Sequence, residues 1–299
     1  MAKKPVVLVV MDGIGYSKSG IGDAVSEART PTLDKLLKNY PNTSLKAHGD
    51  AVGLPSDDDM GNSEVGHNAL GCGQIYAQGA KLVNESIASG KMFSSETWNE
   101  IVGNCVANGS TLHFMGLLSD GNVHSNIEHL KIMIAKAKEQ GVKKVRAHVL
   151  LDGRDVPATS GLIYVVDLEA SMASLNDDTF DAKIASGGGR MTITMDRYQA
   201  DWNMVKMGWD THVKGIGRQF ANTTDAVNTY RKELEVIDQD LPAFVIAENG
   251  EPVGKIVDND SVILFNFRGD RAIEMSMAFD LEEFNGFERG AKPNVVYAG

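Results

Sequence analysis

The sequence predicts an α/β protein of three layers (α/β/α), in which mostly parallel sheets lie between helices. The first observation is the apolar, β-branched run Pro-Val-Val-Leu-Val-Val at residues 5–10, which is typical of a strand buried on both faces of a parallel sheet. The second is the later alternation of apolar strand segments with helical patterns, which favours parallel pairing. The expected later strands are residues 111–118, 144–151, 182–186 and 261–267.

Composition limits the class of protein. The chain has 299 residues, enough for two domains or one large α/β domain, and a net charge of −11 that argues against a nucleic acid or an anionic membrane as partner. Cys72 and Cys105 form no metal-spaced cluster, which suits unpaired thiols in a reducing compartment. The apolar run 5–10 is too short for a signal peptide or a membrane span. We therefore expect a cytoplasmic protein.

Asp12 follows the first expected strand. In open α/β sheets ligands bind beyond the carboxyl ends of strands, so Asp12 lies where chemistry is usually done. A dinucleotide fingerprint would begin with Gly13 and Gly15, but Lys18 occupies the position of its third glycine. A nicotinamide-dependent oxidoreductase therefore ranks far below the other readings.

The next expected helix begins at Pro31. Thr30 is a suitable N-cap and proline is favoured at the first helical position. Leu33, Leu36 and Leu37 then fall on one helical face. We expect this helix to serve core packing only.

Residues 60–67, Met-Gly-Asn-Ser-Glu-Val-Gly-His, place a serine at a helix N-terminus. Asn62 and Ser63 are both good helix caps, and Val65 begins an apolar face. Unpaired N–H groups and the helix dipole would stabilise a phosphate on or beside Ser63, which makes this serine a candidate nucleophile. The alternative is a plain N-cap serine, which is the commoner use of such a residue. Glycines at 71 and 73 and polar residues through Gln78 then predict a domain boundary near residue 78.

Further helices are expected between the later strands. Ser125 to Glu128 matches a capping box for a helix that Gly141 ends. Other helices are expected at about 160–175 and 196–208. Asn249-Gly250 suits a type I′ turn and predicts a hairpin of residues 244–247 with 253–256.

A cation follows each of the four later strands. These residues are His124, Arg154, Arg190 with Arg197, and Arg268 with Arg271. A single arginine is most often a solvated residue or a surface ion pair. Arginines that converge from four strand ends instead predict a small dianionic ligand such as a phosphorylated carboxylic acid, because the guanidinium fork binds phosphate or carboxylate in a bidentate manner.

Other residues at these strand ends could contribute to the same site. His124 could donate to a phosphate or act in acid–base chemistry. Asp155 could accept a proton from a substrate hydroxyl, the alternative being a surface pair with Arg154. The glycines at 187–189 would let the backbone approach the ligand closely, unless they form only a turn.

Six motifs, in order along the chain, resemble those of the cofactor-independent phosphoglycerate mutases, a bisphosphoglycerate-independent family of the alkaline phosphatase superfamily. They are Val-Met-Asp-Gly at 10–13, the segment 60–67, Leu-Ser-Asp-Gly at 118–121 with Val-His-Ser at 123–125, Asp-Gly-Arg-Asp-Val-Pro at 152–157, Gly-Gly-Gly-Arg-Met at 187–191 and Asn-Phe-Arg-Gly-Asp-Arg at 266–271. The resemblance runs from about residue 5 to the last residue.

The resemblance implies an isomerase that interconverts 3-phosphoglycerate and 2-phosphoglycerate in glycolysis and gluconeogenesis. Ser63 matches the serine that is phosphorylated, and Asp12 and Ser63 match ligands of one of two divalent ions, Mn²⁺ first and Co²⁺ or Mg²⁺ as alternatives. Asp155 matches the group that exchanges protons with the glycerate hydroxyls. The residues matching substrate contacts are His124, Arg154, Asp155, Arg190, Arg197, Arg268 and Arg271. No bisphosphoglycerate is required.

The family's architecture is a split phosphatase domain that carries an inserted transferase domain. It implies that residues 1–78 are the first piece of the metal-binding domain, residues 79–293 the substrate-binding domain, and residues 294–299 the start of the return linker. The remaining metal ligands would then lie beyond residue 299, so we expect a fragment without activity of its own. The family is monomeric, but the fragment could self-associate through its exposed first strand. The alternative function is a phosphoglycerate-binding or anion-binding module without turnover.

Overall fold

The computed structural model describes every residue except 1–3, 12, 16 and 18. The chain divides into two compact units, Met1–Leu45 and Lys46–Gly299. This division falls between residues 45 and 46, so the functional boundary near residue 78 stays a prediction. In the described part of the chain no helix is long and apolar enough to cross a membrane.

The described residues of the first unit form two helices, α1 (Ala24–Glu27) and α2 (Pro31–Asn39). Helix α2 begins as predicted, with proline in its first turn, although the Thr30 hydroxyl donates to the Asp34 carboxylate at 2.9 Å instead of capping a backbone N–H. The predicted packing role of α2 is wrong within this unit. Leu36 and Leu37 are 48% and 53% exposed, and none of the helix's described residues is buried.

The predicted strand at residues 5–10 does not form. These residues have no regular structure, and Val6 is 96% exposed. A strand needs a neighbour for its N–H and C=O groups. None of the described residues of Met1–Leu45 forms a strand that could pair with it. Asp12, expected just after this strand, lies outside the described residues.

The second unit begins with short elements around the predicted nucleophile: η1 (Gly49–Val52), α3 (Ser63–Cys72), α4 (Gly79–Ala88), η2 (Met92–Ser94) and α5 (Glu96–Asn108). Val52, Leu54 and Val65 form a small core beneath α3. Gly61 is required where the chain enters α3, because a Cβ there would lie 1.8 Å from the Ala47 carbonyl oxygen.

A mostly parallel sheet organises the rest of the second unit. Its strands are β1 (Thr111–Leu118), β2 (Lys144–Leu151), β3 (Asp181–Gly189), β4 (Arg218–Phe220), β5 (Phe244–Glu248), β6 (Glu251–Pro252), β7 (Ser261–Leu264) and β8 (Val296–Ala298). The order is β4-β5-β3-β2-β1-β7-β8, with β6 paired to β5. Among the described strands the only antiparallel pairs are β3–β5 and β5–β6, so β4 and β5 run opposite to the other strands. The other pairs are parallel, and the predicted mostly parallel α/β sheet is confirmed.

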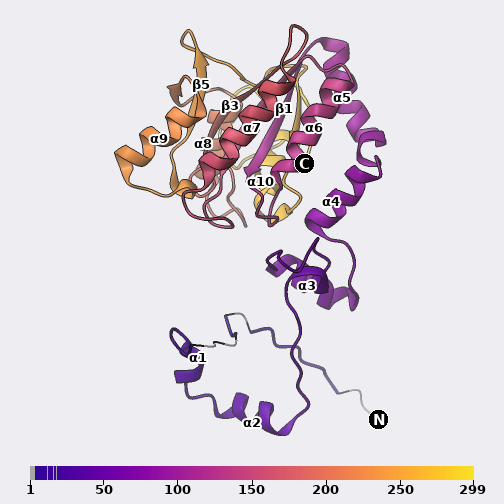
Figure 1. Cartoon of the computed structure of the whole chain (residues 1–299), viewed down its shortest axis with the longest axis vertical. Coiled ribbons are helices and arrows are strands. Elements are labelled where there is room, and N and C mark those ends of the chain that lie inside the picture. The colour runs from indigo at the N-terminus through magenta and orange to yellow at the C-terminus, as the bar shows by residue number, and fades with distance from the viewer. Residues whose placement is uncertain (1–3, 12, 16, 18) are drawn as a thin grey trace. The chain divides into compact units, whose positions relative to one another are not determined.

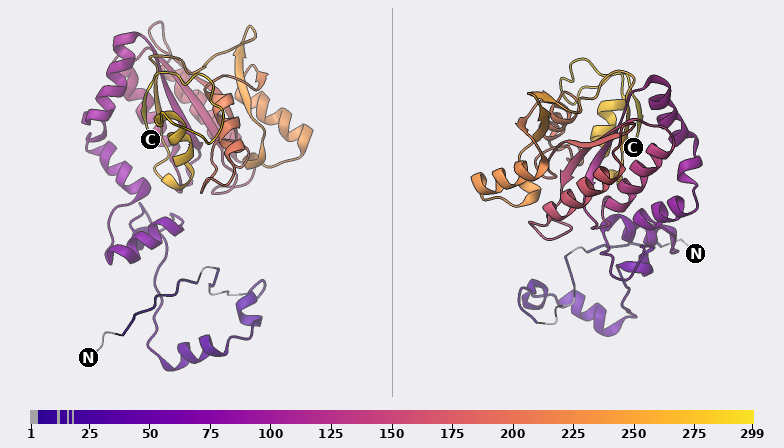
Figure 2. Two further views of the ribbon diagram at one scale, coloured as in Figure 1. Left: turned by 180° about the vertical axis from the view of Figure 1, so that it is seen from behind. Right: turned by 45° about the horizontal axis from the view of Figure 1, so that its top comes forward.

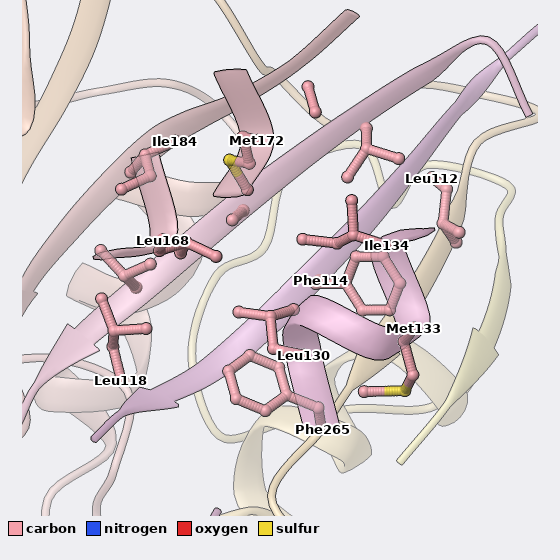
Figure 3. Close-up of a cluster of buried hydrophobic side chains, with 14 of the residues drawn as sticks. Leu112, Phe114, Leu118, Leu130, Met133, Ile134, Leu168, Met172, Ile184 and Phe265 are labelled. Atoms are coloured by element: carbon pink, nitrogen blue, oxygen red, sulfur yellow. The ribbon is translucent and has the colours of Figure 1, made fainter. Parts of the chain in front are cut away.

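Helices cover both faces of this sheet and make three layers (Figures 1 and 2). One face carries α5, α6 (Ile127–Glu139), α7 (Gly161–Leu175) and α9 (Thr223–Leu234). The other carries α8 (Trp202–His212) and α10 (Ile273–Asp280). Side chains of β1 alternate between the two cores, with Phe114 facing α6 and Met115 facing α8 and α10. Figure 3 shows the first core, where Phe114 packs against Leu130 and Ile134.

Some of the predicted element bounds are confirmed and others differ. β1 and β2 have the predicted bounds, whereas β3 is longer and β7 shorter than predicted. α6 begins as expected, but its cap is Asn126, because the Ser125 hydroxyl donates to the Leu117 carbonyl at 2.6 Å. The capping box is therefore wrong.

Two further elements differ in their bounds. α8 begins at Trp202 instead of residue 196, because Tyr198 and Gln199 adopt positive φ values that a helix excludes. The Asn249-Gly250 turn has the positive φ values of a type I′ turn, 52° and 82°, but the returning strand is only Glu251–Pro252.

Candidate functional site

The loops after β1, β2, β3 and β7 meet in one cavity of about 210 Å³ at the carboxyl edge of the sheet. All of the substrate-binding residues predicted from the sequence line it, together with the three residues that precede Ser63. The lining residues are Met60, Gly61, Asn62, Val123, His124, Arg154, Asp155, Arg190, Arg197, Arg268, Asp270 and Arg271. The parallel topology thus brings together cations separated by up to about half of the chain.

Asp152 anchors this site, a role that sequence reasoning missed although the residue opens the Asp-Gly-Arg-Asp motif. Its fully buried carboxylate accepts the backbone N–H groups of Arg154 and Asp155 at 3.1 and 3.0 Å. The same carboxylate accepts Arg190 Nη1 at 2.8 Å and the Ser119 hydroxyl at 2.6 Å. Asp152 therefore fixes the loop after β2 and the arginine after β3 in one arrangement.

Arg190 is held rigidly, with only 1% of its side chain exposed. Besides Asp152 it contacts the carboxylate of Asp155, so Asp155 pairs with Arg190 and not with its neighbour Arg154. The preceding glycines pack against the protein's own backbone, because a Cβ at Gly189 would lie 2.2 Å from the Gln239 carbonyl oxygen. The idea that these glycines allow close approach of a ligand is therefore not needed to explain them.

The loop after β7 supplies two arginines, Arg268 just before η4 (Gly269–Arg271) and Arg271 at its end. Arg271 donates to the Met195 carbonyl at 2.7 Å. Arg268 lies 3.0 Å from Asp270 Oδ2, and its Nε lies 3.4 Å from Glu64 Oε2 without hydrogen-bond geometry. This charge contact joins the arginine cluster to the first turn of α3, directly beside Ser63.

The charges of the cavity favour an anion. Five arginines face two carboxylates, those of Asp155 and Asp270. Burial and the nearby positive charges of Arg190 and Arg197 lower the pKa of Arg271. A dianionic ligand would relieve this repulsion, and guanidinium groups can bind its phosphate or carboxylate in pairs.

His124 is a neutral imidazole inside this cluster. Burial, reinforced by the charges of Arg190 and Arg268 among others, lowers its pKa to about 2. Its Nδ1 has no hydrogen-bond partner, and the nearest carboxylate oxygens are 3.7 and 4.0 Å from its ring nitrogens. A neutral ring in this position can donate one hydrogen bond to a phosphate and accept another.

Ser63 is the first residue of α3 and does not cap it. Asn62 Oδ1 accepts the N–H groups of Glu64 and Val65 at 3.0 and 3.2 Å, so the reading of Ser63 as a plain cap is wrong. The expectation of free amide donors is also wrong for these two groups. The Ser63 side chain is exposed, next to the cavity-lining residues 60–62.

His67 lies one turn further along α3, with Nδ1 3.2 Å from Ser63 Oγ and 2.7 Å from the Ser63 carbonyl oxygen. Because a carbonyl only accepts, the closer contact requires a proton on Nδ1. In this tautomer Nδ1 cannot also accept the Ser63 proton, so His67 is not the base for this serine.

The described residues do not by themselves fit a metal centre. Among them, no three His, Cys, Asp or Glu side chains are grouped so as to hold an ion. Ser63 is one of the two predicted ligands, and Asp12, the other, is not among the described residues.

Fold and site together define a three-layer α/β protein with a cluster of arginines at the carboxyl edge of its sheet. A model of the family described as BPG-independent PGAM N-terminus (iPGM_N) matches residues 83–299, and the chain belongs to this family.

Similar proteins agree with this assignment. The chain is 56% identical over 299 residues to a "Probable 2,3-bisphosphoglycerate-independent phosphoglycerate mutase" of Leptospira interrogans and 48% identical over 302 residues to a phosphoglycerate mutase of this kind from Trypanosoma brucei brucei. These matches cover 99% and 100% of this chain but 55% of each relative, so the chain spans about half the length of the curated relatives it matches.

A solved structure is similar throughout most of the chain. Leishmania mexicana phosphoglycerate mutase "at low cobalt concentration" matches with a TM-score of 0.91 and 47% identity, over 96% of this chain and 53% of that one.

Proposed function

We propose that this chain recognises 3-phosphoglycerate and 2-phosphoglycerate as the substrate-binding part of an isomerase that interconverts them in glycolysis and gluconeogenesis. The observation that carries the proposal is the single cavity in which all the predicted cations meet, next to the segment that presents Ser63. The names of the similar proteins support the same reaction. Since the chain spans about half of their length, substrate recognition is assigned to this chain and turnover to a protein that also includes the other half.

The arginines bind the two anionic ends of the substrate in this proposal. Arg190 and Arg271 are fixed by Asp152 and by the Met195 carbonyl, so little side-chain entropy is lost when they bind the ligand. His124, being neutral, donates a hydrogen bond to an oxygen of the ligand without adding charge.

Asp155 is proposed to carry the proton of the reaction. When the phosphoryl group moves from the substrate to Ser63 Oγ, the Ser63 hydroxyl gives up its proton and the glycerate oxygen that loses the phosphoryl group takes one up. When the other hydroxyl is phosphorylated, it gives up a proton. Asp155 lies in the wall of the cavity, where a hydroxyl of bound glycerate can reach its carboxylate.

Ser63 is proposed to accept the phosphoryl group, and Asp12 and Ser63 to contact one of two divalent ions, Mn²⁺ first and Co²⁺ or Mg²⁺ as alternatives. A bound divalent ion would lower the pKa of the serine hydroxyl. The described residues alone do not make such a site, so the remaining ligands would come from outside them. No bisphosphoglycerate enters the proposal.

We further propose that the functional boundary lies near residue 78, with residues 79–293 as the substrate domain and 294–299 as the start of a linker. The two cysteines are unpaired, which supports a reducing, cytoplasmic location. Self-association of this chain through the exposed residues 5–10 remains a proposal of the same kind.

The alternative function is a phosphoglycerate-binding module without turnover, which the arginine cavity supports equally well. Ser63→Ala distinguishes the two in a protein that includes the other half. It should abolish conversion of 3-phosphoglycerate to 2-phosphoglycerate in a coupled assay with Mn²⁺ and without bisphosphoglycerate, while binding is retained. If no conversion occurs in the unmutated protein while binding persists, the binding-module reading is right.

A further inference from the structure

A continuous chain of buried polar side chains crosses the sheet on the face that α8 covers, away from the cavity lining. None of its members is more than 2% exposed. In order they are Asp260, His113 on β1, His148 on β2, Ser186 on β3, His212 on α8 and Thr194 in the loop after β3. The five contacts that join them measure 3.1, 2.9, 2.7, 2.7 and 3.1 Å.

When the three histidines are neutral, these five hydrogen bonds allow only one arrangement of donors and acceptors. The Asp260 carboxylate accepts, so His113 donates to it through Nε2 and accepts from His148 at Nδ1. His148 then accepts the Ser186 hydroxyl proton at its own Nδ1. That hydroxyl accepts from His212 Nδ1 in turn, which leaves His212 Nε2 as the acceptor for the Thr194 hydroxyl.

The neutral state follows from burial. Burial lowers the pKa of His113, lowers that of His148 well below its usual value, and lowers that of His212 to about 3. Burial, the largest single influence, raises the pKa of Asp260, but the interaction with His113 and the hydrogen bonds from the Val257 and Thr111 N–H groups together outweigh it and lower this pKa. The hydrogen-bond series therefore leaves His212 Nε2 as the acceptor for the Thr194 hydroxyl.

Thr194 is the centre of a strained turn. Its φ is 69°, and the Met195 N–H donates to the Ile193 carbonyl at 2.7 Å, which makes residues 193–195 a γ-turn with positive φ. This turn is rare, and a β-branched residue is especially unfavourable in it. A strained turn persists only where surrounding contacts stabilise it. The hydrogen bond between the Thr194 hydroxyl and His212 Nε2 is such a contact.

The turn contacts Arg271, one of the arginines of the cavity, through the Met195 carbonyl. Met195, the residue after Thr194, is fully buried and offers its carbonyl to Arg271 Nη1 at 2.7 Å. Arg190 and Arg197 flank the same turn in sequence. The direction of the Met195 carbonyl therefore depends on the geometry at Thr194, and the position of the Arg271 guanidinium depends on that carbonyl.

We propose that Thr194 and His212 are positioning residues for the anion site. The buried chain from Asp260 fixes the tautomer of His212, His212 holds the strained turn through the Thr194 hydroxyl, and the turn aims Arg271 at the ligand. The proposal rests on the proposed function, because it assigns these residues to the binding of phosphoglycerate. Neither side chain lines the cavity.

Thr194→Val tests the proposal, because valine keeps the β-branched shape and removes the hydroxyl. We expect the Kd for 3-phosphoglycerate to rise about tenfold by calorimetry. Hydrogen exchange at the Met195 amide should accelerate, and Thr194→Ser should restore both values. Thr211→Val is the matched control. Thr211 is equally buried on α8 and donates to the Met207 carbonyl at 2.7 Å, so its loss should change stability without changing either readout.

If Thr194→Val does not fold, substitutions of His212 test the same hydrogen bond by changing its acceptor. His212→Asn keeps a donor near the Nδ1 position but loses the acceptor at Nε2, whereas His212→Gln keeps an acceptor near Nε2. We expect the asparagine variant to behave like Thr194→Val and the glutamine variant to bind more tightly than it. An unchanged Kd for 3-phosphoglycerate in Thr194→Val, or in His212→Asn, would overturn the proposal.

The two hypotheses fail in different ways. If the unmutated chain does not bind 3-phosphoglycerate, the proposed function is wrong for this chain, and exchange at Met195 in Thr194→Val still decides whether the buried chain holds the turn. If the unmutated chain binds and Thr194→Val binds equally well, the positioning claim is wrong and the proposed function stands.

Discussion

Arg190 donates to the carboxylate of Asp152 at 2.8 Å, and both side chains are almost completely excluded from solvent. This pair links the ends of β2 and β3 directly beneath the cavity. It also explains how an arginine can be buried at the edge of a sheet and still line the cavity.

Asp152→Ala should destabilise the protein strongly, because it removes one of the two carboxylates that contact the buried Arg190 and leaves the N–H groups of Arg154 and Asp155 without their acceptor. The expected loss is about 3–5 kcal/mol in the free energy of unfolding measured with urea. Glu248→Ala is the control, since it breaks the exposed Lys183–Glu248 pair of 2.6 Å and should cost less than about 1 kcal/mol. Equal losses of unfolding free energy in the two variants would show that burial does not make the Asp152–Arg190 pair more stabilising than an exposed pair.

Gly61→Ala should disrupt the segment that presents Ser63. Its new Cβ would lie 1.8 Å from the Ala47 carbonyl oxygen, and a backbone atom cannot move aside as a flexible side chain can. We expect a loss of about 1–3 kcal/mol and faster hydrogen exchange in residues 46–78.

Gly66→Ala in α3 is the matched control for this substitution. Nothing lies within 4 Å of the Cβ it would add. It should be neutral or stabilise the helix by up to about 1 kcal/mol, because alanine is the better helix former. Protection of residues 46–78 that is equal in both variants would contradict the close approach at Gly61.

Acid should weaken the fold through the buried histidines. The pKa of His212 falls from its usual 6.5 to about 3 on folding, so between these pH values the unfolded chain binds more protons than the folded protein. Stability therefore falls as the pH is lowered through this window.

His212→Gln removes this titration. The difference in unfolding free energy between pH 7 and pH 5 should shrink by about 2 kcal/mol relative to the unmutated chain, as measured by urea unfolding at both pH values. His67→Gln is the control, because it removes an exposed histidine in place of a buried one. An unchanged pH dependence in His212→Gln would mean that His212 is not held neutral.

The sequence was sufficient to predict four adjacent strands of the sheet, β3, β2, β1 and β7, and the cations that line the cavity. β1 and β2 are continuous apolar runs that any parallel sheet would bury, and their bounds were correct. The cations were found because a parallel sheet brings the carboxyl ends of its strands to one edge, so the pattern of one cation after each strand had a geometric meaning.

What the sequence could not predict depends on contacts between distant residues. Residues 5–10 have the composition of a strand, yet a strand also needs a partner, and the described residues of the first unit provide none. The start of α8 was missed because Tyr198 and Gln199 adopt positive φ values that a helix excludes. The role of Asp152 could not be predicted, because it depends on four hydrogen bonds that only the folded structure shows.

The most direct test of the central claim is calorimetric titration of the chain with 3-phosphoglycerate, compared with Arg268→Ala and Arg218→Ala. Arg268 lies in the cavity, whereas Arg218 is an exposed arginine of β4 that pairs with Glu233. We expect binding to the unmutated chain and to Arg218→Ala, and affinity at least about tenfold weaker in Arg268→Ala, as for the loss of a charge-assisted hydrogen bond. Failure of the unmutated chain to bind, or equal affinity in Arg268→Ala and Arg218→Ala, would contradict the assignment of the arginine cavity as the phosphoglycerate site.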